Sequence, residues 1–298
     1  MDYVYTLIII IGLYVILSSS FNLVIGYGGL ISIAHPIFYA IGAYGSAVLA
    51  RDHGVPVPVA MAAGALIALA ASILLALPSL RISGDYLLIA SIGFQLGLIE
   101  VFKNVSWSGG AGGLTNIPPA LPPGTDRWVY TAIVVVLAGL SVLLIRALAH
   151  GPYGRAMAAM RDDELAFSAL GRNAMAIKVG IFAIGSGLAG FAGALYAHHF
   201  RYLAPEQFEI LLSAALLTMV VVGGLRSTWG PVVGAIMLEA LPQAITFLNL
   251  PASLLGPLQG LLFTGLVLVF MFVRPQGLVP AGTVWNATRK EANYVPGA

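Results

Sequence analysis

The sequence lacks cysteine altogether and contains few charged residues. Only 9% of its 298 residues are Asp, Glu, Lys or Arg, against about 25% in an average soluble domain. Hydrophobic residues make up 59% of the chain, and the mean hydropathy is +0.94. So few charged side chains cannot cover a water-soluble globule, and lipid must therefore solvate most of the protein. Without cysteine, disulfides and thiolate chemistry are excluded.

Several motifs of enzymes and nucleotide-binding proteins are also missing. No Gly-x-x-x-x-Gly-Lys-Ser/Thr phosphate loop is present, so we expect ATP to be bound elsewhere. No HExxH pattern or Cys/His cluster indicates a metal, and no cofactor is expected. The net charge of +2 gives no reason to expect a nucleic-acid partner. Ser186 and His198 resemble part of a hydrolase site. However, twelve residues on one predicted helix separate them by roughly 18 Å, so the sequence predicts no enzyme.

Nine stretches are long and apolar enough to cross a bilayer, which takes roughly 17–25 helical residues. We therefore expect an all-α polytopic membrane protein, a single domain over residues 1–298 with eight or nine membrane segments. The second and eighth stretches begin at Gly-Gly-Leu and carry a proline several residues later, so either can be broken or re-entrant. No basic region precedes the first stretch, which favours a retained span over a cleaved signal peptide. The stretches are residues 4–25, 30–50, 57–77, 86–102, 128–148, 174–200, 208–224, 230–248 and 254–273.

The distribution of basic residues predicts the orientation of the chain. If the loop 149–173 is cytoplasmic, ten of the fourteen Lys and Arg residues lie on that side and four on the other. Nine crossings then place the N-terminus outside and the C-terminal tail, residues 274–298, inside. The sequence therefore predicts a multi-pass protein of a bacterial-type cytoplasmic (inner) membrane, with the loop 149–173 facing the cytoplasm.

A weak internal repeat is visible. Seven residue types recur at a constant offset of 195, from Gly28-Gly29-Leu30 to Gly223-Gly224-Leu225 and onwards through a serine, a proline and an Ala-Ile pair. In the predicted topology both copies begin at the cytoplasmic face and run outwards, which makes the repeat parallel. Paired segments interrupted by Gly and Pro indicate the substrate path of a transporter. The alternative is that the composition alone, with 35 Gly and 17 Pro, produces the match.

A few polar residues lie within the apolar stretches and are candidates for the substrate path, because ionisable groups are costly in lipid. Each has a structural alternative: a neutral imidazole bonded to a carbonyl, a hydrogen bond between helices, or a helix kink. The candidates are His35, Pro36, Gln95 and Glu239. The sixth stretch is dense in glycine, which we interpret as a signal for close helix packing at Gly180, Gly185, Gly187, Gly190 and Gly193.

The segment 103–127 is the Gly- and Pro-rich excursion on the predicted outer side. It contains the run 108–115 and two proline pairs, at 118–119 and 122–123. One interpretation is a flexible turn followed by a stiff extended piece. The other is a surface that faces an external partner or the mouth of a path.

The loop 149–173 contains a predicted helix over residues 155–170, with Gly171 in the position of a C-cap. The membrane surface, the chain's own helix ends or a protein partner must cover its apolar face. The acidic run 162–164 disfavours anionic lipid, so we favour a protein partner. The face is interrupted by Asp163 and consists of Ala156, Met160, Phe167 and Leu170.

Five motifs together resemble the LivM-type permease subunits of branched-chain amino-acid ABC importers. The resemblance extends over most of the chain, and the fourth motif is the most specific. The motifs are NLVIGYGGLISIAH at 22–35, LRISGDYL at 80–87, GAGGLTNIP at 110–118, GRAMAAMRDDELA at 154–166 and VGGLRSTWGP at 222–231.

The resemblance implies a transport subunit that works by alternating access and leaves ATP hydrolysis to other chains. Its expected partners are a second homologous permease, as a heterodimer, two cytoplasmic ABC ATPases, an external substrate-binding protein and the lipid bilayer. The same machinery for urea, short amides or aromatic acids is an alternative, and a membrane assembly scaffold is a non-transport alternative. The loop resembles the ATPase-coupling loop of such importers, although Gly171 stands one residue later than usual. Its expected coupling residues are Arg155, Met160, Arg161, Asp162, Asp163, Glu164, Phe167 and Gly171.

Overall fold

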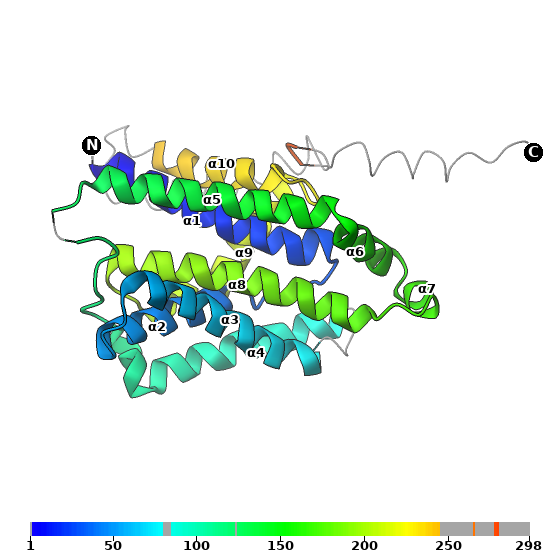
Figure 1. The fold of residues 1–298 in the computed structure, drawn as a ribbon, viewed down its shortest axis with the longest axis horizontal. Helices are drawn as coiled ribbons and strands as arrows, with labels where there is room; N and C mark the ends of the chain where they lie inside the picture. The colour runs from blue at the N-terminus through cyan, green and yellow to red at the C-terminus, as the bar shows by residue number, and fades with distance from the viewer. Residues whose placement is uncertain (1, 80–84, 123, 245–264, 266–276, 280–298) are drawn as a thin grey trace, which may run out of the picture.

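The computed structural model describes residues 2–79, 85–122, 124–244, 265 and 277–279, and the regular structure of this part is helical (Figure 1). The one β-bridge in the described residues joins Leu114 to Leu203. Three short 3₁₀ helices, η2 (Ser106–Ser108), η3 (Gly110–Gly112) and η4 (Pro205–Phe208), lie between the longer elements. The main helices are α1 (Asp2–Asn22, continued by the π-helix η1, Leu23–Tyr27), α2 (His35–Asp52), α3 (Val57–Ser79), α4 (Asp85–Asn104), α5 (Arg127–His150), α6 (Pro152–Asp162), α7 (Glu164–Ala169), α8 (Ala174–Phe200), α9 (Ile210–Gly223) and α10 (Gly230–Ala244).

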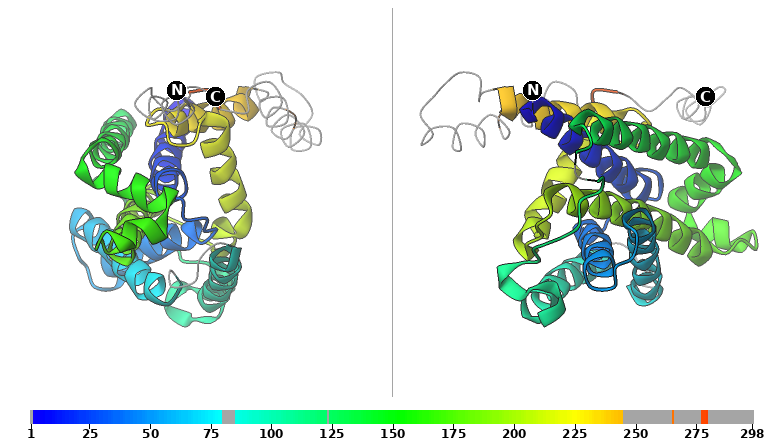
Figure 2. Two further views of the ribbon diagram at one scale, coloured as in Figure 1. Left: turned by 90° about the vertical axis from the view of Figure 1, so that its right-hand side faces the viewer. Right: turned by 60° about the vertical axis from the view of Figure 1, so that its left-hand side comes forward.

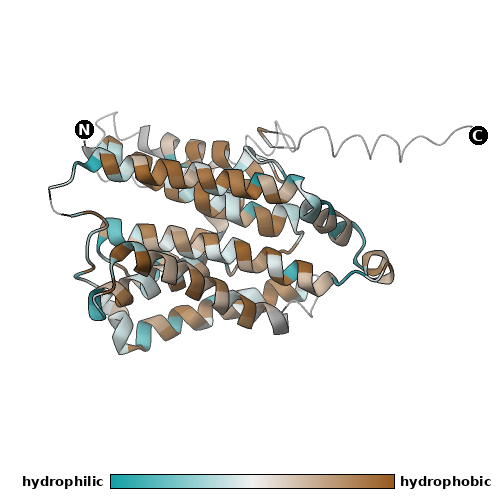
Figure 3. Cartoon of the chain, in the orientation of Figure 1, coloured by the Kyte–Doolittle hydropathy of each residue, from teal (hydrophilic) through white to brown (hydrophobic). Residues whose placement is uncertain are grey.

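Six described helices are long and apolar enough to span a membrane, which confirms a polytopic helical membrane protein. Neither the second nor the eighth predicted stretch is among the six; they form α2 and the shorter apolar helix α10. The ninth stretch, 254–273, lies outside the described residues apart from residue 265, as does the tail 274–298 apart from residues 277–279. Hydrophobic residues cover the lengths of the helices, and hydrophilic ones gather mostly towards the two ends of the bundle (Figure 3).

The two long polar excursions lie at opposite ends of the bundle. In Figures 1 and 2 the helices α6 and α7 project from one end, while the connection from α4 to α5 crosses the other. The helices α1, α5 and α8 run lengthwise between these ends, and α1 packs against both α5 and α8. The residues predicted for ATPase coupling are therefore separated by the thickness of the bundle from the Gly/Pro-rich segment 103–127.

The two copies of the repeat have the same local structure. In each copy a helix ends just before or within the Gly-Gly pair, and the second glycine has positive φ, +68° at Gly29 and +123° at Gly224. A short non-helical stretch follows. The serine of each copy then accepts a hydrogen bond from a backbone N–H at or beside the start of the next helix: Ser32 from Ala34 (3.3 Å) and Ser227 from Gly230 (3.2 Å). The shared pattern therefore encodes a shared helix–break–helix unit.

The two breaks lie against each other, and Asn22 joins them. Its Nδ2 donates to Ser227 O (2.9 Å), and its Oδ1 accepts from the backbone N–H of Arg226 (3.1 Å). Tyr27 and Thr228 add a contact between hydroxyl oxygens at 3.5 Å. Asn22 is 1% exposed, so its amide replaces water for the backbone of the second break.

Glycine allows α2, α3 and α8 to approach to backbone contact. A Cβ atom on Gly42 would overlap the backbone of Gly190, and one on Gly193 would overlap Tyr39 O. A Cβ on Gly64 of α3 would lie 2.6 Å from Gly42 O. The glycine-rich sixth stretch is therefore a packing surface, as predicted, and small residues let the three helix axes come close.

This packing predicts that Gly42→Ala destabilises the protein, because the added methyl group has no space against α8. We expect a loss of about 1–3 kcal/mol in the free energy of unfolding, typical of overpacking, measured by denaturant titration in detergent micelles. Gly93→Ala on α4 is the matched control, since a Cβ there meets open space within the described part of the chain. Equal stability of the two variants would contradict the close approach of α2 and α8.

Candidate functional site

The loop 149–173 contains two helices, α6 and α7, rather than the single helix predicted over 155–170. The prediction was wrong at Asp163, whose extended backbone (φ −151°, ψ 99°) separates them. The Asp163 carboxylate accepts a hydrogen bond from Ala166 N (2.9 Å) and so caps α7. Aspartate favours this N-cap role over an interior helical position. Gly171 has a φ of +76° just beyond α7, which confirms its predicted position at the helix end.

The break at Asp163 changes which side chains are covered. Met160 and Phe167 are 2% and 6% exposed, and both belong to the main hydrophobic core of the chain. The predicted partner-facing stripe was therefore wrong for these two residues, because the chain's own helices cover them. The large apolar side chains that remain exposed in the loop are Leu165 (85%) and Leu170 (81%), both on or just after α7.

Arg161 connects the end of α6 to the break between α1 and α2. Its Nη1 donates to Gly26 O at 3.1 Å, and its Nη2 lies 2.9 Å from the Asp162 carboxylate. The aliphatic part of the side chain lies over Gly29, where a Cβ atom would collide with it. Arg161 therefore points inwards to the membrane helices, while Asp162 and Asp163 remain exposed.

A second ionic contact fixes α7 to the start of α8. Lys178 Nζ lies 2.7 Å from the Glu164 carboxylate, and Lys178 is only 6% exposed. Burial of the lysine makes this pair more sensitive to loss of either partner than a surface pair would be. Sequence reasoning missed the role of Lys178 in this ion pair. The available signal was a lysine within the first two turns of an apolar helix, where it needs an acidic partner. Among the other predicted coupling residues, Arg155 is exposed on α6.

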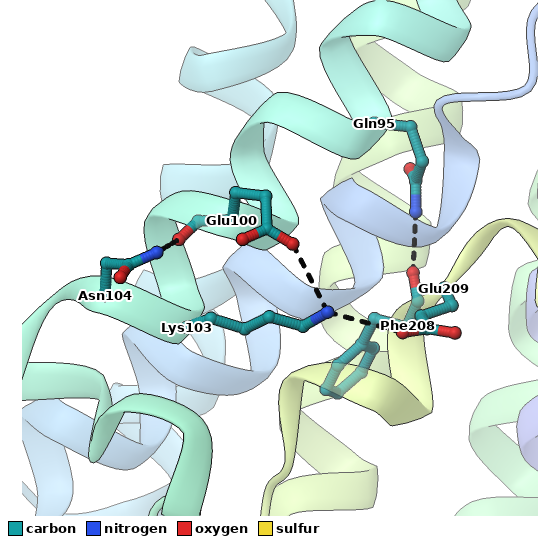
Figure 4. Close-up of polar contacts among 6 residues, drawn as sticks. All are labelled: Gln95, Glu100, Lys103, Asn104, Phe208 and Glu209. Atoms are coloured by element: carbon teal, nitrogen blue, oxygen red, sulfur yellow. Dashed lines mark hydrogen bonds and ion pairs between the residues drawn. The ribbon is translucent and has the colours of Figure 1, made fainter.

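Gln95 joins α4 to two interruptions of the membrane helices, and Figure 4 shows its contact with Phe208. Its Oε1 accepts from Ile37 N in the first turn of α2 (3.0 Å), and its Nε2 donates to Phe208 O before α9 (2.6 Å). The side chain is fully buried. The Ile37 N–H also lies 3.3 Å from Ala34 O, so Gln95 provides the shorter of two contacts for this first-turn donor in a region where lipid offers none. Its role in this structure is thus to join helices.

Further side chains complete the support of the break before α2, and sequence reasoning missed them. Ser91 Oγ accepts from Ile33 N (2.9 Å), and Ser213 Oγ donates to Ile33 O (2.5 Å). Near the opposite end of α4, Lys103 Nζ lies between Glu100 (3.4 Å) and Glu209 (3.5 Å), as Figure 4 shows. Serine within an apolar helix was the only sequence signal for the first two contacts, and it does not identify their partners.

The remaining path candidates are not gathered in one place. His35 and Pro36 form the first turn of α2, close to Ile37 and so to Gln95. His35 is 4% exposed, its Nε2 lies 2.9 Å from Ser20 Oγ, and its ring packs on Phe21. Glu239 lies partly buried on α10, which packs against α1 and α9. Within the described residues no hydrogen bond connects Glu239 to the other three candidates. The role of these residues in a substrate path therefore stays a prediction.

The described part is an all-helical bundle with two interrupted membrane segments, and a compact two-helix loop binds to one of them. This architecture is typical of a membrane transport subunit. The described residues contain no group of His, Cys, Asp or Glu able to hold a metal ion.

Comparison with known proteins gives the family. The family described as "Branched-chain amino acid transport system / permease component" matches residues 3–272, and the chain belongs to it. It is therefore a permease subunit of an ABC importer and a multi-pass inner-membrane protein.

The relatives include proteins named high-affinity branched-chain amino acid transport system permease protein LivM. That of Escherichia coli is 33% identical over 295 residues, covering 90% of this chain and 68% of the relative. That of Salmonella typhimurium is 32% identical with the same coverage. A probable branched-chain amino acid transport permease protein LivM of Methanocaldococcus jannaschii is 29% identical over 217 residues, 68% of this chain and 62% of the relative. No solved structure matches the chain.

The contact of Arg161 with Gly26 predicts a measurable effect on the first break. Arg161→Met keeps the aliphatic packing over Gly29 but removes the hydrogen bond, so the backbone of residues 28–30 opens more readily. We expect their amide hydrogen exchange to become about tenfold faster, as for the loss of one charged hydrogen bond, measured by mass spectrometry. Arg155→Met, on the exposed side of the same helix, is the control. Unchanged exchange in the Arg161 variant would show that the contact does not hold the break.

Proposed function

We propose that this chain carries branched-chain or closely related amino acids into the cell as one half of the membrane pathway of an ABC importer. The observation that carries the proposal is the α6–α7 loop: it presents apolar side chains outwards at Leu165 and Leu170, while Arg161 extends inwards to the first membrane break. A loop built in this way can pass movement of a bound partner to a membrane segment. The substrate named for the three relatives favours branched-chain amino acids over urea, short amides or aromatic acids.

The proposed orientation places α6 and α7 in the cytoplasm, the N-terminus outside and the C-terminus inside. The distribution of basic residues supports it, since five described basic residues lie in or beside the loop: Arg146, Arg155, Arg161, Arg172 and Lys178. Two ATPase subunits would bind the cytoplasmic side, one of them on this loop. A homologous second permease would complete the path within the bilayer, and a substrate-binding protein would deliver the amino acid from outside.

Alternating access requires two arrangements of the membrane segments and a partner that binds them unequally. The structure offers a connected set of contacts for that purpose. It runs from Arg161 to the π-helix at Gly26, and from Asn22 at the start of that π-helix to the second break at Ser227. π-Helical turns are frequent at functional sites. We infer that ATP binding shifts α6 and α7 and that these contacts pass the shift to both breaks together.

Transport by the assembled complex tests the proposed function. Proteoliposomes that contain this chain with its partner subunits should accumulate radiolabelled L-leucine only when ATP and the binding protein are supplied. Unlabelled isoleucine and valine should compete, whereas urea, acetamide and benzoate should not. Competition by urea, acetamide or benzoate alone would favour the alternative substrate classes, and assembly without any ATP-dependent uptake would favour a scaffold.

The exposed leucines of the loop give a separate prediction. Leu165→Ser combined with Leu170→Ser should leave folding intact, because both side chains are exposed, but should reduce co-purification of the ATPase subunits about tenfold or more. The control is Val59→Ser, which changes an exposed apolar residue (57%) at the start of α3, on the proposed outer side. Normal ATPase recruitment by the double variant would exclude these residues from the docking surface.

A further inference from the structure

The Gly/Pro-rich segment 103–127 is bound to the end of α8 by backbone hydrogen bonds. Leu114 N donates to Leu203 O (2.7 Å), and Leu203 N donates to Leu114 O (3.0 Å). His198 Nδ1 lies 2.8 Å from Pro118 O, and Ala120 N donates to His198 O (3.3 Å). These contacts hold residues 114–120 along the bundle end, as the extended piece of the first interpretation requires, and a role in facing an external partner stays a prediction.

The fixed segment forms one wall of a cavity. The cavity has a volume of about 410 Å³ and lies between the first turns of α1, the start of α5, the end of α8, and residues 119–122 and Thr125. This volume is within the range of small-molecule pockets, about 300–1,000 Å³. Its lining combines apolar groups, including Ile9 and Leu121, with the charged residues Asp126, Arg127 and Arg201.

The cavity is lined by charged side chains of both signs and by two helix ends. α5 begins at Arg127 and α8 ends at Phe200, so a helix N-terminus and a helix C-terminus meet at the same cavity. Their partial charges are positive and negative respectively. Asp126 precedes the N-terminus of α5 and Arg201 follows the C-terminus of α8, so each side chain offsets the partial charge of its helix end, while Arg127 adds a further positive charge. Such a site is complementary to a small molecule that carries both a carboxylate and an ammonium group.

Arg201 is anchored to the Gly/Pro-rich segment through one nitrogen of its guanidinium. Its Nε donates to Ile117 O at 3.1 Å, which fixes the guanidinium against the Gly/Pro-rich segment. No residue of the described part accepts a hydrogen bond from either Nη of Arg201. Its backbone is left-handed, with a φ of +59°, as is common for a residue that ends a helix. The two Nη groups match the bidentate geometry of a carboxylate.

We propose that this cavity binds the transported amino acid in free form at the outer end of the permease. The carboxylate binds Arg201 at the end of α8 and Arg127 at the start of α5, and the ammonium group binds Asp126, which directly precedes α5. The hydrocarbon side chain lies against Ile9 and Leu121. This inference rests on the proposed function and adds a site within one permease chain, separate from the break-supporting contacts described above.

Ligand-observed NMR on the assembled complex in lipid nanodiscs, without the binding protein, tests the site. Saturation transfer to L-leucine gives an apparent dissociation constant. Arg201→Gln should weaken binding about tenfold, because a charge-assisted hydrogen-bond pair is lost. Arg51→Gln is the control, since it also removes an arginine near the proposed outer face, one paired with Asp52 away from the cavity. Equal affinities of these two variants would overturn the proposal.

Ligand analogues and further variants distinguish a specific loss of binding from a loss caused by misfolding. L-Leucinol lacks the carboxylate and 4-methylpentanoate lacks the ammonium group, so both should bind the wild-type complex about tenfold more weakly than leucine. Arg201→Asn accommodates the left-handed backbone, and Asp126→Asn should weaken leucine but not 4-methylpentanoate. Leucinol binding as tightly as leucine would overturn the proposal. So would an Arg201 effect that arises only with the binding protein present, because the carboxylate would then belong to that protein.

The outcome also separates this site from the proposed function. If wild-type complexes transport leucine and the Arg201 variants bind and transport it normally, only the cavity site is wrong. If wild-type complexes transport no branched-chain amino acid, the proposed function itself fails.

Discussion

Interrupting a helix inside a bilayer exposes backbone groups that lipid cannot satisfy, and much of this structure serves to satisfy them. The break before α2 is supported by serine and glutamine side chains from α4 and α9, and the break before α10 by Asn22. These contacts bring helices from distant parts of the sequence together. Arg161 connects the same set of hydrogen bonds to the α6–α7 loop. The two breaks and the loop are thus parts of one hydrogen-bonded structure.

Much of the helical layout could be predicted from the sequence, because apolar length and Gly/Pro interruptions are local signals. The sixth stretch, 174–200, coincides with α8, and the Gly-Gly-Leu pairs correctly marked both interruptions. The repeat also proved to have a physical basis, since the second glycine has positive φ in each copy. These features depend on properties of the chain within a few residues of each position.

Features that depend on tertiary partners could not be predicted in the same way. Met160 and Phe167 formed a plausible exposed stripe only if the loop were one helix, and a single N-cap at Asp163 removed that assumption. Gln95 was predicted as either a path residue or a joint between helices. Its partners, Ile37 and Phe208, lie 58 and 113 residues away along the sequence. No local pattern could therefore decide between the two roles of Gln95. The cavity at Arg201 likewise requires four separate segments.

The backbone contact of Gly42 with Gly190 and Gly64 has a mechanical consequence. Side chains at most helix interfaces can change rotamer and let the helices slide, but here main chain meets main chain and no rotamer is available. Sliding of α2, α3 and α8 past one another is therefore more restricted than at borders made by side chains. At the border of α2 with α4 and α9, by contrast, hydroxyl and amide groups can exchange one backbone partner for the next.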